Sequence, residues 1–172
     1  GAGRVITADG GVVSVQGTDG FEVTGTFGAG AAIGTPGAGT RMFFNPRKAS
    51  FRAGRVGSFL WNEGYVGNYS VAMGENLEAS GDYSISFGRD NISFGSFSTT
   101  IGEYCSAQSI GSFAVGYFSL AEGSYSLAMG SEAHASATNA VALGKQVEAW
   151  GEYSTATGDE SKAHGTNSVA MG

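Results

Sequence analysis

The sequence is short of cysteine, proline and charge, and each shortage excludes a class of protein. Its single cysteine, Cys105, cannot form a disulfide within the chain, and we interpret it as a small apolar residue of the interior. Only two of the 172 residues are proline, 41% are hydrophobic, and no Gly-X-Y triplet persists. This composition excludes a collagen or a disordered linker and indicates an ordered β protein.

Sequence signals for catalysis are missing as well. No His, Cys and carboxylate residues have the spacing of a zinc site, and neither a G-x-S-x-G motif nor a calcium-binding nonapeptide occurs. The segment GAGAAIG from Gly28 lacks both the Lys-Ser/Thr pair and the βαβ context of a phosphate loop. We therefore expect no enzymatic activity, no metal and no cofactor.

The chain also lacks a signal peptide, a membrane-spanning segment and a lipidation motif, so we expect no membrane contact within this stretch. It begins at Gly1 without a methionine and ends flush with a repeat, which we interpret as a piece of a longer protein. The formal net charge of −6 argues against nucleic acid as a partner.

Glycine recurs at every fourteenth residue of the last two thirds of the chain. The eight members of this column are Gly74, Gly88, Gly102, Gly116, Gly130, Gly144, Gly158 and Gly172. A fixed short period is typical of a solenoid, in which each unit mainly contacts its neighbours. Counting from Trp61, the sequence predicts eight units over residues 61–172, with this column at unit position 14.

A second column of small residues stands at unit position 7. Its members are Gly67, Gly81, Gly95, Ser109, Gly123, Ala137, Gly151 and Gly165. Because glycine allows a positive φ and close backbone approach, two such columns predict two bends per unit, with the glycines at the turns. Each unit then forms one coil of a narrow, all-β parallel solenoid.

Positions 9 to 14 of all eight units contain no Asp, Glu, Lys or Arg. Within this stretch positions 10 and 12 are small, and positions 11 and 13 are mostly bulky. Successive strand residues point to opposite faces, so we expect small residues inside the coil and an uncharged bulky face outside. Such a face would be covered by other copies of the chain in a symmetric oligomer. The predicted interface residues are Val71, Met73, Ile85, Phe87, Ile101, Val115, Leu127, Met129, Val141, Leu143, Val169 and Met171. In the alternative arrangement, the bulky residues fill the coil and the small ones face solvent.

The run NYSVAMGENLEASGDYSISFG, with its echoes GSYSLAMG, TNAVALG and TNSVAMG, resembles the YadA-like head repeat of trimeric autotransporter adhesins. The resemblance covers residues 61–172, with departures at Tyr65, Ser93, Ala140 and Thr157. It implies a left-handed parallel β-roll, a homotrimer with three chains side by side, and a head that binds host surface molecules. The same repeat also occurs in tail-fibre-like proteins of phages and injection machines.

Residues 1–60 lack the period and form a separate region of the prediction. Residues 5–28 are expected to contain short strands separated by Asp-Gly and Gly-Gly turns, and residues 28–40 a Gly-rich connector. The segment 41–56 is basic and β-prone, whereas the repeats carry twelve acidic residues against three basic ones. This polarity indicates either docking between consecutive modules or a solvated basic collar.

Candidate binding residues lie outside the uncharged stretch or at its start. Aromatic residues at position 9 (Tyr69, Tyr83, Phe97, Tyr125 and Tyr153) are interrupted by Gly111, Asn139 and Asn167. We interpret this column as a ladder that stiffens the rod, with a groove for a glycan or matrix protein as the alternative. His134 and His164 are two coils apart, about 10 Å along the rod, at different unit positions. The candidate ligand surface comprises Trp150, Phe94, Tyr125 and Tyr153.

Two functions fit these observations. The first is a trimeric extracellular fibre head that recognises a cell-surface or matrix ligand, either protein or glycan. The second is a spacer rod in the tail fibre of a phage or contractile injection system, with no ligand of its own. The location is extracellular in both cases, at a bacterial surface or on a phage or injection particle.

Overall fold

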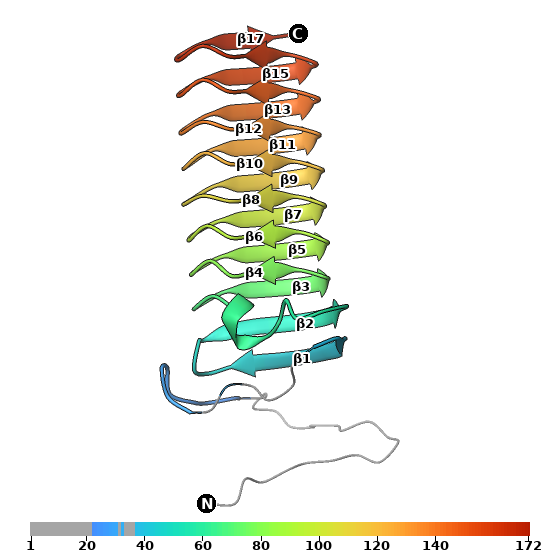
Figure 1. The fold of residues 1–172 in the computed structure, drawn as a ribbon, viewed down its shortest axis with the longest axis vertical. Helices are drawn as coiled ribbons and strands as arrows, with labels where there is room; N and C mark the ends of the chain where they lie inside the picture. The colour runs from blue at the N-terminus through green and yellow to red at the C-terminus, as the bar shows by residue number, and fades with distance from the viewer. Residues whose placement is uncertain (1–21, 31, 33–36) are drawn as a thin grey trace, which may run out of the picture.

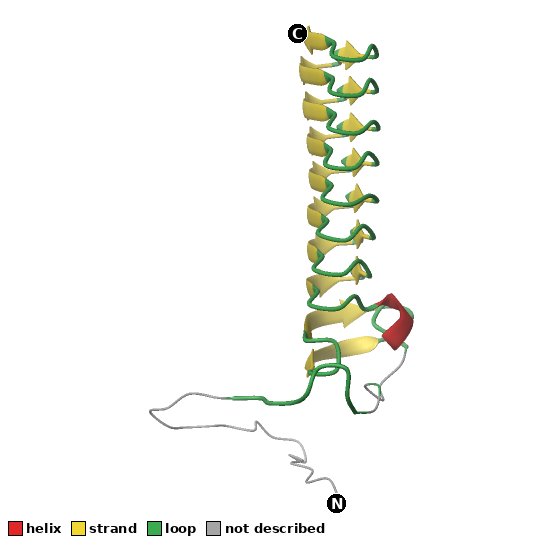
Figure 2. Cartoon of the chain, turned by 90° about the vertical axis from the view of Figure 1, so that its left-hand side faces the viewer, coloured by secondary structure: helices red, strands yellow, loops and turns green. Residues whose placement is uncertain are grey.

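The computed structural model describes residues 22–30, 32 and 37–172, and most of them form a long, straight rod (Figure 1). Two strands open the rod, β1 (Gly39–Asn45) and β2 (Ser50–Val56), followed by the 3₁₀ turn η1 (Glu63–Tyr65). The rest of the rod alternates long and short strands, which stack into two separate layers (Figure 2).

The strand bounds repeat with the period of the sequence. The long strands are β3 (Val71–Glu75), β5 (Ile85–Arg89), β7 (Thr99–Glu103), β9 (Phe113–Tyr117), β11 (Leu127–Ser131), β13 (Val141–Lys145), β15 (Thr155–Asp159) and β17 (Val169–Met171). The short strands are β4 (Glu78–Ala79), β6 (Ile92–Ser93), β8 (Ser106–Ala107), β10 (Leu120–Ala121), β12 (His134–Ala135), β14 (Glu148–Ala149) and β16 (Lys162–Ala163).

All contacts between successive coils are parallel and shifted by one unit. In the ten-stranded sheet, with order β1-β2-β3-β5-β7-β9-β11-β13-β15-β17, Ala128 pairs with Ala142 and Gly130 with Gly144. The seven-stranded sheet follows the same rule, so that Ala135 pairs with Ala149. The predicted parallel β-solenoid of 14-residue coils is therefore confirmed.

The interior of the coil is filled by the small residues. Ala72, Ala128 and Ala142 at position 12 are completely buried, and so are Ser70 and Ser84 at position 10. Position 5 adds a third small column, which is alanine in every buried case except Ser93. The two sheets lie so close together that larger side chains fit only at position 3, where Leu77, Cys105 and Val147 are buried. The bulky residues of positions 11 and 13 point outward, which excludes the alternative in which they fill the coil.

The position 14 glycines are not at the turns, so this part of the prediction is wrong. They lie inside the long strands with φ between +111° and +143° from Gly74 to Gly158. A Cβ atom there would overlap the backbone carbonyl of the next coil, as Gly102 shows against Gly116. These glycines therefore allow close stacking in an extended conformation that other residues rarely adopt.

The chain instead bends at residues in the left-handed region at positions 2 and 9. Asn76 has φ 51° and Tyr83 has φ 60°, and their equivalents in the other coils behave alike. The position 7 residue opens the second bend, because the Ser84 amide donates a hydrogen bond to the Gly81 carbonyl at 3.2 Å. The Ser84 hydroxyl donates to the same carbonyl at 2.6 Å, which explains why serine prevails at position 10.

The rod begins earlier than the sequence period indicates. Strand β2 pairs in parallel with β3, and Gly54 stands opposite Gly74, so the first coil spans 20 residues instead of 14. The extra residues carry η1, which lies beside the N-terminal end of the rod (Figure 2). Strand β1 pairs antiparallel with β2 and ends the sheet. The boundary expected at residue 61 is therefore replaced by one before β1.

Basic residues of this N-terminal end are used inside the fold. Arg52 is fully buried, and its guanidinium donates to the Ser70 carbonyl, the Ser70 hydroxyl and the Ala79 carbonyl at 2.8 to 3.0 Å. Burial lowers the pKa of Arg52 to about 10, so it remains a cation at neutral pH. Lys48 donates to the Glu63 carbonyl at 2.6 Å. The interpretation as a solvated collar is therefore wrong for these two residues, which close the end of the coil.

The remaining predictions for residues 1–40 are only partly accessible to comparison. Residues 1–21 lie outside the described part of the chain, and residues 22–28, for which short strands were also expected, form none. Of the predicted connector, residues 39 and 40 belong to β1, and residues 31 and 33–36 are outside the described part.

Candidate functional site

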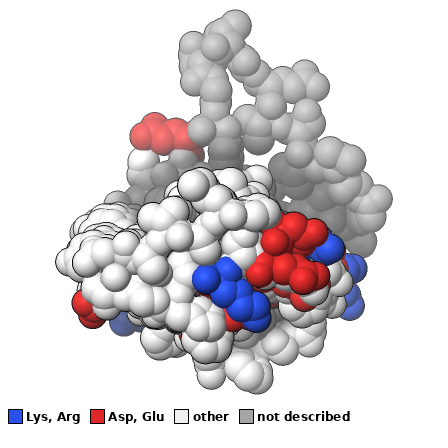
Figure 3. All heavy atoms as spheres, turned by 90° about the horizontal axis from the view of Figure 1, so that it is seen from above, with Lys and Arg blue, Asp and Glu red and all other residues white. Residues whose placement is uncertain are grey.

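The outward side of the ten-stranded sheet is a continuous apolar surface, called here the apolar face. It contains every predicted interface residue, and Met73, Ile101 and Met129 remain 45%, 39% and 41% exposed in the single chain. The members are Val71, Met73, Ile85, Phe87, Ile101, Val115, Leu127, Met129, Val141, Leu143, Val169 and Met171, together with Thr99, Phe113, Thr155 and Thr157 at the same positions. Charged side chains occupy other parts of the circumference (Figure 3).

The apolar face continues into the first two strands, which the sequence period did not reveal. Strand register places Phe44 opposite Phe51, and Phe51 opposite Val71. In the neighbouring column, Met42 stands opposite Ala53 and is 71% exposed. The face therefore runs along the full length of the sheet, from β1 to β17.

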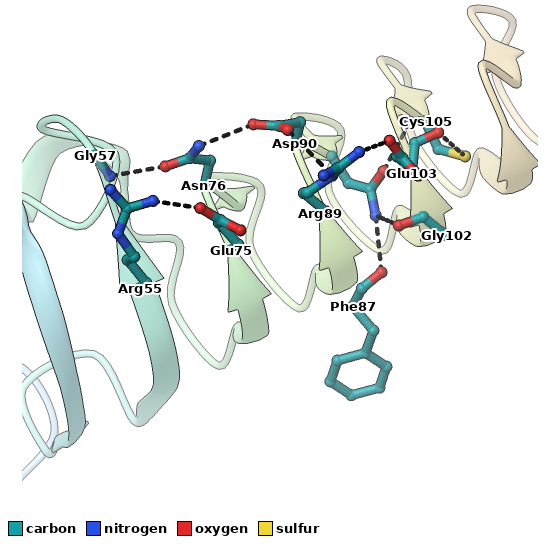
Figure 4. Close-up of polar contacts among 11 residues, drawn as sticks. Arg55, Gly57, Glu75, Asn76, Phe87, Arg89, Asp90, Gly102, Glu103 and Cys105 are labelled. Carbon is teal, nitrogen blue, oxygen red and sulfur yellow. Dashed lines mark hydrogen bonds and ion pairs between the residues drawn. The ribbon is translucent and has the colours of Figure 1, made fainter.

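One edge of the apolar face carries polar side chains that pair from coil to coil. Ion pairs join Arg55 to Glu75 and Arg89 to Glu103, and the Asn76 amide donates to the Asp90 carboxylate at 3.0 Å (Figure 4). Pairs of this exposed kind contribute at most about 1 kcal/mol each to stability. Their regular spacing nevertheless favours the observed register of the coils.

The opposite edge carries the predicted aromatic ladder, and the stack of rings is confirmed for part of the rod. Tyr69, Tyr83 and Phe97 stack with ring centroids 4.7 and 4.8 Å apart. Phe27 of the N-terminal segment extends the ladder, stacking on Tyr69 at 4.8 Å. Beyond Gly111 the stack ends.

The candidate ligand residues are not gathered at one place. Tyr125 packs against Gly111, where an added Cβ would lie 2.7 Å from the tyrosine ring, and is 64% exposed. Tyr153 stands two coils further along the same column. Phe94 shares the position 6 column with Trp150 but is four coils away. Within the described part of the chain, none of these three rings stacks on another aromatic ring.

Trp150 is the centre of a mixed aromatic and polar group. Its indole stacks on the His164 imidazole with centroids 4.6 Å apart and an interplanar angle of 8°. The His134 ring approaches edge-on at 6.3 Å. The tryptophan thus lies between the two histidines, which are two coils apart as the sequence predicted.

Carboxylates hold these side chains in place. A nitrogen of His134, Nε2, lies 2.7 Å from Glu122 Oε2. Lys162 donates to Glu148 at 2.8 Å, and His164 Nε2 lies 3.5 Å from the same carboxylate. The bond from Lys162, followed by that from His164, lowers the pKa of Glu148 below its ordinary value.

Sequence reasoning missed a second exposed aromatic group. Tyr104 stacks on Phe118 at 4.7 Å, and the Tyr117 ring meets Phe118 edge-on at 4.6 Å. These residues occupy positions 1 and 2 of neighbouring units, so the signal was the pair Tyr117-Phe118 one coil after Tyr104. Phe118 also lines an open groove of about 520 Å³ between the columns of positions 2 and 4, whose other walls include Glu132, His134 and Lys162.

Two further observations concern only the described residues. No group of three or more His, Cys, Asp or Glu side chains there could hold a metal ion. No helix among them is long and apolar enough to cross a membrane. Cys105 is buried with a free thiol, and burial raises its pKa, in agreement with the role of an interior residue.

Comparison with known proteins identifies the repeat. A search of the curated proteins found no match. The sequence model of the YadA head domain repeat, which describes two copies, matches residues 66–91, 107–133, 121–146 and 149–172. These segments make up half of the sequence and coincide with the regular coils of the rod. From the coil register and this match together, we conclude that the chain belongs to the YadA head domain repeat family.

Proposed function

We propose that this protein is a homotrimeric extracellular rod that recognises a ligand on a cell surface or in the matrix. The observation that carries the proposal is the apolar face, which is uncharged and uncovered along ten strands of the single chain. Monomeric proteins rarely expose a continuous apolar surface of this length. Three copies meeting along these faces would bury it, and membership of the family favours three chains.

The two edges of the apolar face support a closed ring of copies. The aromatic ladder around Tyr83 borders one edge, and the ion pairs around Arg89 border the other. In a cyclic assembly each contact joins unlike edges of neighbouring chains. Charged side chains then stay at the rim, where water reaches them, and the bulky residues lie at the centre.

A spacer rod is the second candidate, and the regularity of the coils favours it. Binding sites usually lie on loops that interrupt a scaffold. Only the first coil is longer than 14 residues, and it lies at the N-terminal end. As a spacer in the fibre of a phage or injection particle, the rod would only set a distance between other domains.

Binding of the purified trimer to cells separates these candidates. The full chain, labelled with a fluorophore at its N-terminus, is applied to epithelial cells and to immobilised matrix proteins. An unrelated trimeric rod of similar charge serves as the control. Saturable binding beyond the control supports recognition. Absence of saturable binding to every surface would contradict it and leave the spacer.

A further inference from the structure

Trp150 lies on the side of the rod that stays open if copies meet along the apolar face. It directly follows β14 in the seven-stranded sheet, which forms the layer opposite the ten-stranded sheet (Figure 2). Its side chain is 49% exposed in the described structure. This surface is therefore available for a ligand in the trimer proposed above.

The position 6 column forms a notch beside the indole. One ring face is covered by His164 of the following coil. In the preceding coil the same column holds Ser136, which is too small to cover the other ring face, and the coil before that holds Glu122. Coils are about 4.8 Å apart, so Trp150 and Glu122 are separated by about 10 Å with only a serine between them. A single flat ring fits this space.

The polar groups at the notch suit a neutral ligand that carries hydroxyl groups. Glu122 is already paired with His134, and Glu148 with Lys162. These carboxylates therefore attract a further cation only weakly. They remain fixed hydrogen-bond acceptors, and Ser136 adds a hydroxyl that makes no side-chain hydrogen bond within the described residues.

We propose that the notch formed by Trp150, Ser136, Glu122 and His134 binds a neutral sugar ring of a cell-surface or matrix glycan. The C–H face of the sugar would lie on the free face of the indole, as apolar surfaces do on aromatic rings. Its hydroxyl groups would donate to Glu122 and exchange hydrogen bonds with Ser136 and His134. This assignment rests on the binding function proposed above and names the ligand class.

Phe94 provides a matched control in the same column. It is more exposed than Trp150, at 64%, and its column neighbours are Ser80 and Gln108. It therefore offers an aromatic ring without a carboxylate or imidazole beside it. If an exposed ring were enough, the two residues would behave alike.

The test uses the full-length trimer and the neutral methyl glycosides of glucose, galactose, mannose, N-acetylglucosamine and N-acetylgalactosamine. Binding is followed by saturation-transfer NMR and by tryptophan fluorescence. The chain contains two tryptophans, and Trp61 is buried, so a fluorescence change reports on Trp150. We expect at least one glycoside to bind with a Kd on the order of 1 mM.

We expect Trp150→Ala to weaken that binding at least about tenfold, as loss of an aromatic anchor does. Trp150→Phe should retain part of the affinity, and Phe94→Ala should leave it unchanged. Melting curves verify that each variant is folded. The proposal is overturned if no glycoside binds, if Trp150→Ala binds as well as wild type, or if methylated lysine binds in place of every glycoside.

Cell binding distinguishes a failure of this site from a failure of the proposed function. If wild type and Trp150→Ala bind cells equally well before and after enzymatic removal of surface sugars, recognition stands and the sugar site is wrong. If glycosides bind at Trp150 but the trimer binds no cell or matrix surface, the sugar site stands and recognition of cells is wrong.

Discussion

At the scale of the residue, the two small columns have different physical causes. Position 14 is glycine in every unit because φ is far into the positive range and the next coil lies against its Cα. At position 7 the backbone is ordinary, since no positive φ occurs there, and Ser109 and Ala137 replace glycine. The first column is therefore a conformational requirement and the second mainly a requirement for small size.

The substitution Gly102→Ala should destabilise the rod by more than about 2 kcal/mol, because it adds backbone strain to a clash with the Gly116 carbonyl. Gly165→Ala is the control, since its added Cβ would come no closer than 3.7 Å to the listed side chain of Ser168. Urea unfolding monitored by circular dichroism measures both. Equal midpoints for the two variants would show that position 14 imposes no special requirement.

The sequence predicted that glycine recurs, but not why. A period reveals which residues stack, and says nothing of their dihedral angles. The actual bends are occupied by Asn76, Tyr83 and their equivalents, which include Glu132 and Phe118 and have no common composition. Left-handed residues of this kind could not be recognised without coordinates, so the turns were assigned to the glycines nearby.

At the scale of the coil, the aromatic ladder stabilises a strained bend. Tyr69, Tyr83 and Phe97 have φ close to +60°, which costs about 1 to 2 kcal/mol for a residue of this type. Stacking on both sides offsets the strain, at about 0.5 to 1.5 kcal/mol per aromatic pair. Where the ladder stops, the column changes to Gly111, Asn139 and Asn167, which adopt this conformation more readily.

Comparison of two tyrosine variants tests this balance. Tyr83→Asn removes two stacks, so we expect a loss of about 1 kcal/mol even after the strain is relieved. Tyr125→Asn makes the same change at a ring that stacks on no other described aromatic, and its stability should change by less than half as much. Thermal unfolding of both trimers provides the measurement. A larger loss for Tyr125→Asn would mean that the ladder does not stabilise the bend.

The N-terminal coil shows where prediction from a period ends. Gly54 stands in register with Gly74 but 20 residues before it, so it falls outside the 14-residue frame. The burial of Arg52 depends on this longer coil, since its partners Ser70 and Ala79 come from the next two turns. A basic segment with no visible relation to the repeat was consequently read as a surface feature.

At the scale of the whole molecule, the apolar face determines the state of assembly. The alternation of small and bulky residues was sufficient to predict which residues point outward. The neighbours of Trp150 were partly predictable, because residues 14 apart are adjacent once the coil is known. The contact with His134 was not, since positions 4 and 6 come together only through the shape of the bend.

The variant Leu143→Asp should prevent assembly of the trimer. It would place three carboxylates without partners at the centre, at a cost of about 3 to 5 kcal/mol for each buried charge; Val141→Asp should act alike. Gln108→Asp introduces the same charge on the opposite, exposed side and should assemble normally. Sedimentation velocity gives the state of assembly, and circular dichroism verifies β structure. Stable Leu143→Asp trimers would mean that the interface lies elsewhere.

The constant shift between neighbouring coils has a consequence for how such a gene can change. Because Ala128, Ala142 and Ala156 are interchangeable members of one ladder, removing or duplicating 14 codons joins two compatible surfaces. Unequal recombination between similar repeats would therefore shorten or lengthen the rod by about 4.8 Å per event without disturbing either end. Reach, in such a protein, can evolve separately from folding.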